Sequence, residues 1–159
     1  MFTQDVQITF SLAVREAQRR HHEFLTTEHI LYAMLFDEQG QDILRACGGD
    51  VDNLREDLEL YFDQHLEALD QVDEDMPEQT VGLQNVLQRT VTHMQSSGRE
   101  EIGNGDILSA MLEQEDCLAA PILQDEGLHR LDCYYSMLLH ASDASFEEIE
   151  PTLRYRHWR

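Results

Sequence analysis

The sequence contains no lysine: its 11 positively charged residues are all arginine. A nucleotide-binding P-loop needs the lysine of GxxxxGK[ST] to hold the phosphates, so this sequence contains no such loop. It also has no GxSxG, HExxH or glycine-rich dinucleotide-binding motif. These absences exclude the enzyme classes that those motifs define.

Cysteines and long apolar runs are also scarce. The three cysteines, Cys47, Cys117 and Cys133, lie far apart without a CxxC pair, which indicates a reducing compartment and buried thiols. The first residues lack the basic region and apolar core of a signal peptide. No run approaches the roughly 18 apolar residues that a membrane span needs. We therefore expect a cytoplasmic protein.

The charge balance is strongly acidic. Asp and Glu number 32 against 11 Arg, which gives a formal net charge of −21 over 159 residues. Such a surface repels nucleic-acid phosphates and anionic lipid, so we expect neither nucleic acid nor membrane as a partner. The 42% hydrophobic content can still supply a core, for one compact domain or for two half-domains that share it.

One short motif occurs twice at a constant offset. ILYAML at 30–35 returns as ILSAML at 107–112, each time behind a polar segment rich in Thr, Gly, Asn and acidic residues. An internal repeat of this kind predicts two copies of one structural module. The same order of helices is therefore expected in both halves.

Apolar residues recur at three- and four-residue steps through the first half, which predicts helices. The expected helices are 3–20, one capped by Thr26, one over 38–47 that stops at Gly48 and Gly49, and one capped by Asp50. The segment 65–79 is acidic, contains Pro77 and loses the periodicity, so it is the expected linker.

The same order returns in the second half. Thr80 begins a helix that Gly98 ends, Asn104 caps the next, a short one ends at Gly127, and the last covers 128–139. We therefore predict an all-α fold in which two pseudo-symmetric four-helix repeats, 1–64 and 80–140, pack into one globular domain. Residues 141–159 are either a mobile tail or, capped by Ser145 with Glu148, a short docked helix.

His21, His22, Glu23 and His29 form the densest cluster of potential metal ligands. Zinc accepts imidazole and carboxylate, which makes His21 and His22 weak candidates, but a loop separates them from His29. The alternative is solvated loop histidines with one histidine at a helix start, and we expect no metal or cofactor. A thiol nucleophile is a further alternative, but the cysteines lie in or beside apolar stripes, which favours core thiols.

Two segments carry a resemblance to a known family: AVREAQRRHHEFLTTEHILYAML in the first repeat and LQNVLQRTVTHMQSSGREE in the second. Over about residues 1–140 the chain resembles the double Clp N-terminal domain of AAA+ unfoldases, most of all that of the ClpA type. The resemblance implies a non-catalytic docking domain, flexibly mounted on a hexameric ATP-driven motor that feeds unfolded protein to the ClpP peptidase. The motor modules are missing here, and 141–159 would lead toward them.

The resemblance also implies partners and site residues. Such domains receive the adaptor ClpS and touch protein substrates, and by similarity Glu23, Thr26 and Glu28, completed by Thr80 and Val81, are the expected adaptor-binding group. We expect the carboxylates at an exposed helix start, where they can pair with a partner without a buried-charge cost. The alternative is that Glu28 only complements the helix dipole and Thr26 only caps.

Arg89 and Arg130 match basic positions of the ClpA type and are possible peptide-binding residues, whereas Asn85 occupies another such position. Glu28 keeps the glutamate with which ClpC-type domains hold phosphoarginine, but Gly105 replaces the second, so we do not expect that activity. The competing functions are a peptide-binding chaperone module with a groove between the repeats, and a zinc-dependent or thiol enzyme. The isolated domain is expected to be monomeric.

Overall fold

The computed structural model describes residues 1–46, 48–69, 76–114 and 119–125. Its elements are α1 (Gln4–Arg19), β1 (Phe24–Leu25), α2 (Thr27–Met34), α3 (Glu38–Ala46), α4 (Val51–His65), β2 (Glu78–Gln79), α5 (Val81–Ser97), α6 (Asn104–Glu113) and α7 (Ala119–Asp125). The predicted all-helical fold is confirmed, with one pair of two-residue strands in addition. None of the described helices is long and apolar enough to cross a membrane. The cysteines, Arg130, the expected helix 128–139 and the segment 141–159 lie outside the described residues.

The helix ends follow the capping residues that the sequence predicts. Thr26, Asp50 and Thr80 accept hydrogen bonds from first-turn amides of α2, α4 and α5. These bonds satisfy amide donors that would otherwise have no partner at a helix start. Gly48 and Gly98 follow α3 and α5 with φ of 91° and 71°, a left-handed geometry that glycine adopts without a Cβ clash.

One predicted cap is wrong. Gly103, and not Asn104, is the N-cap of α6, and the Asp106 side chain accepts a hydrogen bond from the Gly103 amide at 2.8 Å. The Asn104 side chain is buried and its Nδ2 donates to Asp37 Oδ2 at 3.5 Å. Asn104 therefore connects the two repeats, because its amide points toward repeat one and away from its own helix end.

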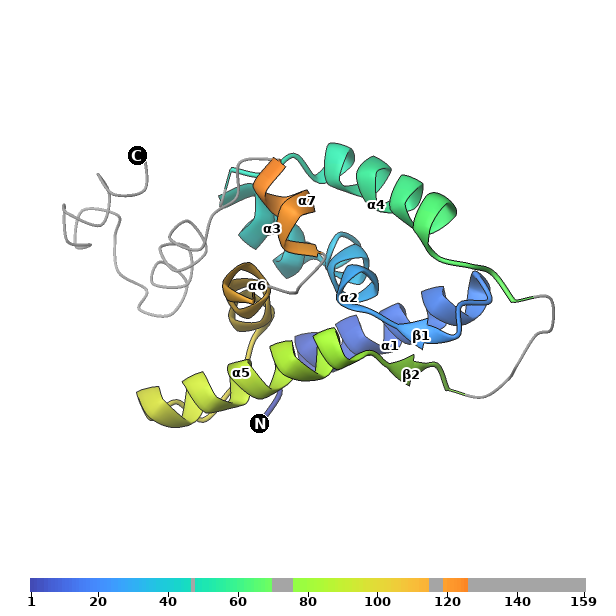
Figure 1. The fold of residues 1–159 in the computed structure, drawn as a ribbon. Helices are drawn as coiled ribbons and strands as arrows, with labels where there is room; N and C mark the ends of the chain where they lie inside the picture. The colour runs from blue at the N-terminus through green and yellow to red at the C-terminus, as the bar shows by residue number, and fades with distance from the viewer. Residues whose placement is uncertain (47, 70–75, 115–118, 126–159) are drawn as a thin grey trace.

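Helix α2 is the centre of the core. All eight of its residues are buried. It contacts α1, α3, α4, α5, α6 and α7, and Figure 1 shows it between α1 and α4. Its apolar residues Ile30, Leu31 and Met34 belong to the repeated ILxAML motif, and elements of both repeats cover its polar face as well. Burial of each large apolar side chain contributes roughly 1.5–3 kcal/mol to the stability of the fold. Because elements of both repeats bury α2, this helix stabilises the packing of one repeat against the other.

The two repeats exchange short strand contacts at two equivalent places. Residues 77 positions apart correspond to each other in the repeats. Leu25 pairs with Gln79 where β1 meets β2, in parallel. Phe2 pairs with Ile102 at the corresponding position, also in parallel. The residues before the first helix of each repeat thus lie against the residues before the second helix of the other.

The backbone hydrogen bonds at these two crossings match. The Thr80 amide donates to the Leu25 carbonyl at 3.1 Å, and the Thr3 amide donates to the Ile102 carbonyl at 3.0 Å. Equivalent residues therefore make equivalent bonds, which supports the pseudo-symmetry that the repeated motif predicts. Neither repeat completes these contacts alone, so the described parts of the two repeats are packed together at both crossings.

Candidate functional site

The contact between β1 and β2 gathers residues that lie far apart in the sequence. The Glu78 amide donates to the Glu23 carbonyl at 3.1 Å, directly before the start of α5. The strands lie together at one end of the molecule, beside the first turn of α5 (Figure 1). Three members of the expected adaptor-binding group, Glu23, Thr80 and Val81, therefore lie at one crossing. We call Glu23, Phe24, Glu78, Thr80 and Val81 the β1–β2 surface.

The β1–β2 surface combines exposed apolar and acidic side chains. Phe24 is 43% exposed and Val81 is 69% exposed. Glu23 and Glu78 are exposed beside them. An exposed apolar patch that is rimmed by polar side chains is typical of a protein interaction site. The arrangement fits a partner with an apolar patch and a basic rim.

The equivalent crossing at Phe2 and Ile102 has a different surface. Glu101 and Gln4 occupy the positions that correspond to Phe24 and Val81. Met1 is the exposed large apolar residue there among the described residues. The two crossings thus share a backbone arrangement, but only the β1–β2 crossing carries the Phe24 and Val81 pair.

Thr26 and Glu28 lie beneath this surface, and the expectation of an exposed helix start is wrong for both. Glu28 is only 1% exposed and Thr26 is buried. The cause is that α2 enters the core at its first turn. Thr27 donates from Oγ1 to Glu28 Oε2 at 3.3 Å, and Glu28 Oε1 has no hydrogen-bond partner among the described residues. Burial raises the pKa of Glu28 above its ordinary value.

Replacement of Glu28 by glutamine is expected to stabilise the protein at pH 7.5 by about 1 kcal/mol. A raised native pKa means that stability falls as the pH rises through it, and a neutral amide of the same shape removes that loss. Urea unfolding at pH 7.5 and pH 5 measures the change, which should be smaller at pH 5. A Glu28→Gln variant that is less stable than the wild type at pH 7.5 would contradict this account.

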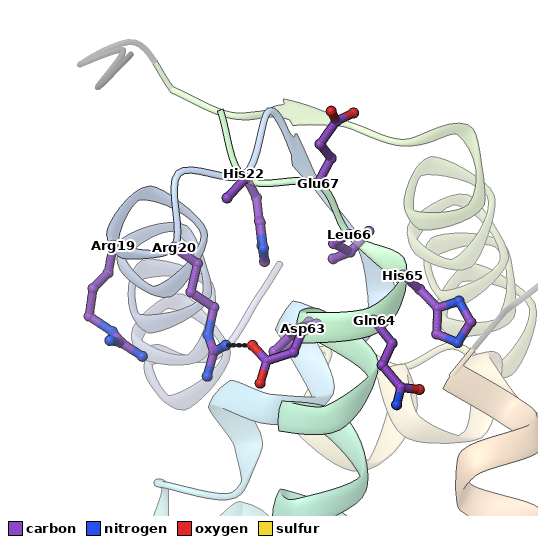
Figure 2. A pocket seen from close by; sticks show the side chains of 10 residues that line it. Arg19, Arg20, His22, Asp63, Gln64, His65, Leu66 and Glu67 are labelled. Atoms are coloured by element: carbon purple, nitrogen blue, oxygen red, sulfur yellow. Dashed lines mark hydrogen bonds and ion pairs between the residues drawn. The ribbon is translucent and has the colours of Figure 1, made fainter. Parts of the chain in front are cut away.

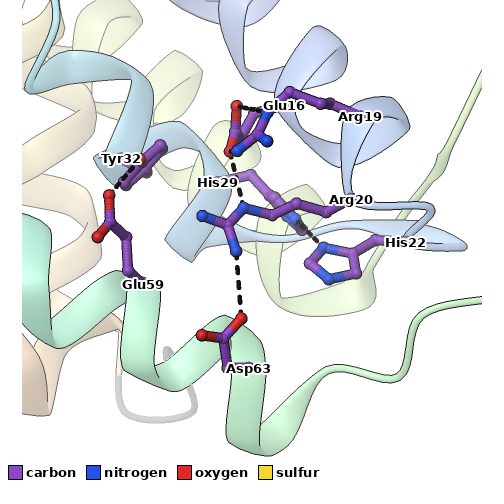
Figure 3. Close-up of polar contacts among 8 residues, drawn as sticks. All are labelled: Glu16, Arg19, Arg20, His22, His29, Tyr32, Glu59 and Asp63. Atoms are coloured by element: carbon purple, nitrogen blue, oxygen red, sulfur yellow. Dashed lines mark hydrogen bonds and ion pairs between the residues drawn. The ribbon is translucent and has the colours of Figure 1, made fainter.

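A buried pair of imidazoles supports the start of α2 (Figure 3). His22 Nδ1 lies 2.8 Å from His29 Nε2. The Thr26 amide donates to His29 Nδ1 at 3.0 Å, so the proton of neutral His29 is on Nε2 and is donated to His22. His22 in turn carries its own proton on Nε2. The expectation of a solvated loop histidine is wrong for His22, which is 9% exposed.

Both rings are held neutral. Burial, and then the neighbouring His22, lower the pKa of His29 to about 3. Burial and the charge of Arg20 also lower the pKa of His22. A proton on His22 Nδ1 would face the N–H of His29, and His29 could relieve this only by a tautomer change that displaces the Thr26 amide. Protonation of the pair is therefore coupled to loss of the α2 capping box.

Arg20 and Phe62 complete this cluster. The Arg20 guanidinium lies 4.9 Å from the Phe62 ring centroid, and its Nε is 2.7 Å from Glu16 Oε1. Figure 3 shows Arg20 extended between Glu16 and Asp63, which lies 3.5 Å from its Nη1. The His29 ring stacks on Phe62 with a centroid distance of 4.9 Å. Phe62 thus connects α4 to the C-terminal end of α1 and to the start of α2.

His21 has a backbone role. It adopts a left-handed φ of 59°, at the position that Gly98 fills in the second repeat. The amides of His21 and His22 donate to the carbonyls of Gln18 and Ala17 at 3.0 and 2.8 Å, which closes α1 in a Schellman motif. Within the described ranges no three His, Cys, Asp or Glu side chains are grouped so that they could hold a metal ion.

Arg89 lines a polar groove of about 520 Å³ between α5 and α6. Its Nε donates to Gln114 Oε1 at 3.0 Å, and its Nη1 lies 3.7 Å from Glu113 Oε2. The groove belongs to repeat two alone and its lining is polar, so it is not the groove between the repeats that the peptide-binding alternative describes. Arg130, the other possible peptide-binding residue, lies outside the described part of the chain.

The fold and the site define this protein as a helical domain of two repeats, with an apolar and acidic surface where the repeats cross. The sequence pattern of the Clp repeat (R) N-terminal domain family matches residues 1–126, and the chain belongs to this family. The resemblance carried by TTEHILYAML is thus confirmed.

Individual relatives agree with this assignment. The chain is 30% identical over 153 residues to the ClpA homolog protein of Fuscovulum blasticum, covering 94% of this chain and 19% of that relative. It therefore spans about a fifth of the length of that curated relative. The fold is similar to the Hsp104 N-terminal domain of Candida albicans, with a TM-score of 0.74, 14% identity and coverage of 89% and 92% of the two chains. It is also similar to the N-domain of ClpV from Vibrio cholerae, with a TM-score of 0.70, 21% identity and coverage of 87% and 85%.

Proposed function

We propose that this chain is the docking domain of a ClpA-like, ATP-dependent unfoldase subunit of the cytoplasm, and that its β1–β2 surface receives a ClpS-like adaptor. Membership in the Clp repeat family and the relative named ClpA homolog support this proposal. Motor modules and the contact with ClpP would belong to other parts of the protein. Protein substrates would arrive with the adaptor, and no catalytic step is assigned to this chain.

The observation that carries the proposal is the exposure of Phe24 and Val81 on a fixed backbone. Strand pairing holds Phe24 in place, and Val81 is the first residue of α5, so a partner that buries them does not have to order the backbone first. Glu23 and Glu78 add negative charge that favours a basic rim on the partner. The Thr80 hydroxyl already caps α5, so Thr80 would serve this surface by fixing the start of that helix. Thr26 and Glu28 would act from below, by holding the start of α2 against this surface.

Replacement of Val81 by glutamate is expected to weaken adaptor binding about tenfold or more, because it places a charge in the apolar part of the interface. Val81 is the first residue of α5, where a negative side chain is compatible with the helix dipole, so the fold should be unaffected. Titration calorimetry with a cognate ClpS-like adaptor measures the change.

The matched control is Leu60→Glu, the same kind of change at an exposed apolar residue of α4. It should bind the adaptor within about twofold of the wild type. If Val81→Glu and Leu60→Glu bind equally well, the adaptor docks elsewhere. If the wild type gives no heat or shift at high micromolar concentrations, the adaptor proposal itself fails.

Direct peptide capture is a second candidate function, and the polar groove beside Arg89 is the observation that favours it. A peptide with an acidic side chain could pair with Arg89, but it would have to compete with Gln114 and Glu113, which already contact the guanidinium. Adaptor docking needs no such exchange. We therefore place adaptor docking first.

A further inference from the structure

The two repeats hold the start of their second helix in the same way. Thr26 and His29 form the capping box of α2, and the residues 77 positions later, Gly103 and Asp106, form that of α6. The Thr26 amide donates to His29 Nδ1 at 3.0 Å, and the Gly103 amide donates to Asp106 Oδ2 at 2.8 Å. Each of these amides directly follows the residues that form one of the two crossings. Each capping box therefore fixes the chain beside one crossing.

A side chain that follows the first helix of each repeat holds the capping acceptor in place. In repeat two, Arg99 Nη1 and Nη2 donate to Asp106 Oδ1 and Oδ2 at 2.7 and 2.8 Å. In repeat one, His22 occupies the position of Arg99, and its Nδ1 lies 2.8 Å from His29 Nε2. An arginine–aspartate pair of this kind keeps its charges between pH 7 and pH 5, whereas imidazoles titrate near this range. Equivalent contacts are thus a permanent ion pair in one repeat and a titratable pair in the other.

Solvent can reach the titratable pair. His22 lines a pocket of about 620 Å³ between the end of α1 and the end of α4, and Figure 2 shows its ring between Arg20 and Leu66. A proton bound at His22 Nδ1 would face the N–H of His29, so His29 would have to carry its own proton on Nδ1. That proton would point at Thr26 Oγ1, 2.9 Å away, and leave the amide of buried Thr26 without an acceptor. A buried amide without an acceptor is costly, so protonation favours rearrangement of the residues before α2.

The charged groups around the pair do not reverse this effect. They are Glu16, Arg19, Arg20 and His21 from α1 and the residues after it, Glu28 from α2, and Asp63, His65 and Glu67 from α4 and the residues after it. Burial has the largest effect on both rings and lowers the pKa of each, and the charge of Arg20 lowers it further, whereas Glu16 raises it. Burial would raise the pKa of Glu16 itself, but its bonds with Arg19 and Arg20 lower it, so Glu16 keeps its charge at pH 5. Burial raises the pKa of Glu28, which therefore opposes the histidines and offsets one of them at most.

We propose that the His22–His29 pair is a proton-sensitive latch: proton uptake opens the β1–β2 crossing, whereas the equivalent crossing, which the ion pair holds, stays closed. When the latch opens, the Thr26 amide leaves His29, and the strand residues before it release the amides of Glu78 and Thr80. The apolar side chains of the β1–β2 surface are then no longer held on one fixed backbone. The opening itself does not depend on adaptor docking, and only its effect on adaptor binding rests on the proposed function.

Amide hydrogen exchange of the ¹⁵N-labelled protein without adaptor tests the latch. An open form with ordinary histidines gains up to about tenfold over the closed form for each pH unit below 6.5 and for each histidine. With a net effect of one histidine, the protection factors of the Thr26, Glu78 and Thr80 amides are expected to fall about twentyfold from pH 7 to pH 5. Those of Thr3 and Gly103 should stay within about threefold. Equal falls at both crossings, or no fall at either, would overturn the proposal.

Two double variants isolate the titratable pair. His22→Arg with His29→Asp transfers the ion pair of repeat two to repeat one and should make the protection of the Thr26 amide independent of pH between 7 and 5. His22→Gln with His29→Gln keeps an acceptor for this amide without titrating, and it gives the same test if the charged pair does not fold. The matched control is His65→Gln with His93→Gln, two exposed histidines outside the pair, which should keep the pH dependence of the wild type. A pH dependence that persists in the His22→Gln, His29→Gln protein would contradict the latch.

Titration calorimetry with a cognate ClpS-like adaptor separates this inference from the proposed function. The wild type is expected to bind the adaptor about tenfold more weakly at pH 5 than at pH 7, and the His22→Gln, His29→Gln protein should bind it equally at both. The same loss of affinity in both proteins would overturn control of binding by the latch. No binding to the wild type at pH 7 would overturn adaptor docking alone, because the exchange experiment needs no adaptor.

Discussion

Acidification from pH 7 to pH 5 is expected to remove about 2 kcal/mol of stability through His29 alone. The pKa of His29 is about 3 in the folded protein against 6.5 for an unperturbed histidine. Each pH unit below 6.5 costs about 1.4 kcal/mol, because the unfolded chain takes up a proton that the folded ring rejects. This stability is fully present above pH 6.5 and is lost as the pH falls toward 3. His22 acts in the same direction, and Glu28, with its raised pKa, acts in the opposite one.

A His29→Gln variant isolates this effect. Glutamine at this position can still accept the Thr26 amide in the capping box, but it does not titrate. Urea unfolding at pH 7, 6 and 5, followed by circular dichroism, should show that the advantage of the wild type over the variant shrinks by about 2 kcal/mol across this range. The control is His93→Gln on the exposed side of α5, which should follow the wild type. Parallel pH profiles for the wild type and His29→Gln would contradict the neutral imidazole pair.

Replacement of Phe62 by alanine is expected to cost about 3–5 kcal/mol of unfolding free energy. The Phe62 ring is fully buried, stacks with His29 and lies under the Arg20 guanidinium. Its removal leaves a cavity, loses a cation–π contact and admits water to the imidazole pair. The loss is comparable to the whole stability of a marginal domain, so the variant is expected to be partly unfolded at 37 °C.

Urea unfolding at pH 7.5 measures this loss, with Phe62→Leu as an intermediate substitution that should cost less because it leaves a smaller cavity. The matched control is Leu60→Ala, an exposed position on the same helix, where the change should stay within about 0.5 kcal/mol. A Phe62→Ala variant as stable as Leu60→Ala would show that the aromatic cluster does not join α4 to the rest of the core.

Helix positions and the double repeat were predictable from the sequence, because the signals are local. Thr26, Asp50 and Thr80 each place a side-chain acceptor at a helix start, and Gly98 ends α5 in the left-handed geometry. The repeated ILxAML motif fixed the correspondence between the halves. The prediction that Asn104 caps α6 was wrong, because the Asn104 side chain makes a contact with the other repeat instead.

The contacts between the repeats were not predictable from periodicity. A parallel pairing of two residues, such as Leu25 with Gln79, leaves no alternating pattern to detect. The exposure of Phe24 and the burial of Glu28 both follow from that pairing and from the coverage of α2 by elements of both repeats. The polar sequence around Glu28 suggested an exposed helix start. That prediction was wrong because burial depends on what packs against a residue as well as on its type.

Hydrogen exchange with and without a cognate ClpS-like adaptor tests the docking surface most directly, because the molecule contains its own control. The two crossings share their backbone bonds but differ in their exposed side chains. The adaptor is predicted to slow amide exchange in 23–25 and 78–81 and to leave the equivalent segments 1–3 and 100–102 unchanged. Slowed exchange at the second crossing alone, or equal changes at both, would contradict a docking surface built around Phe24 and Val81.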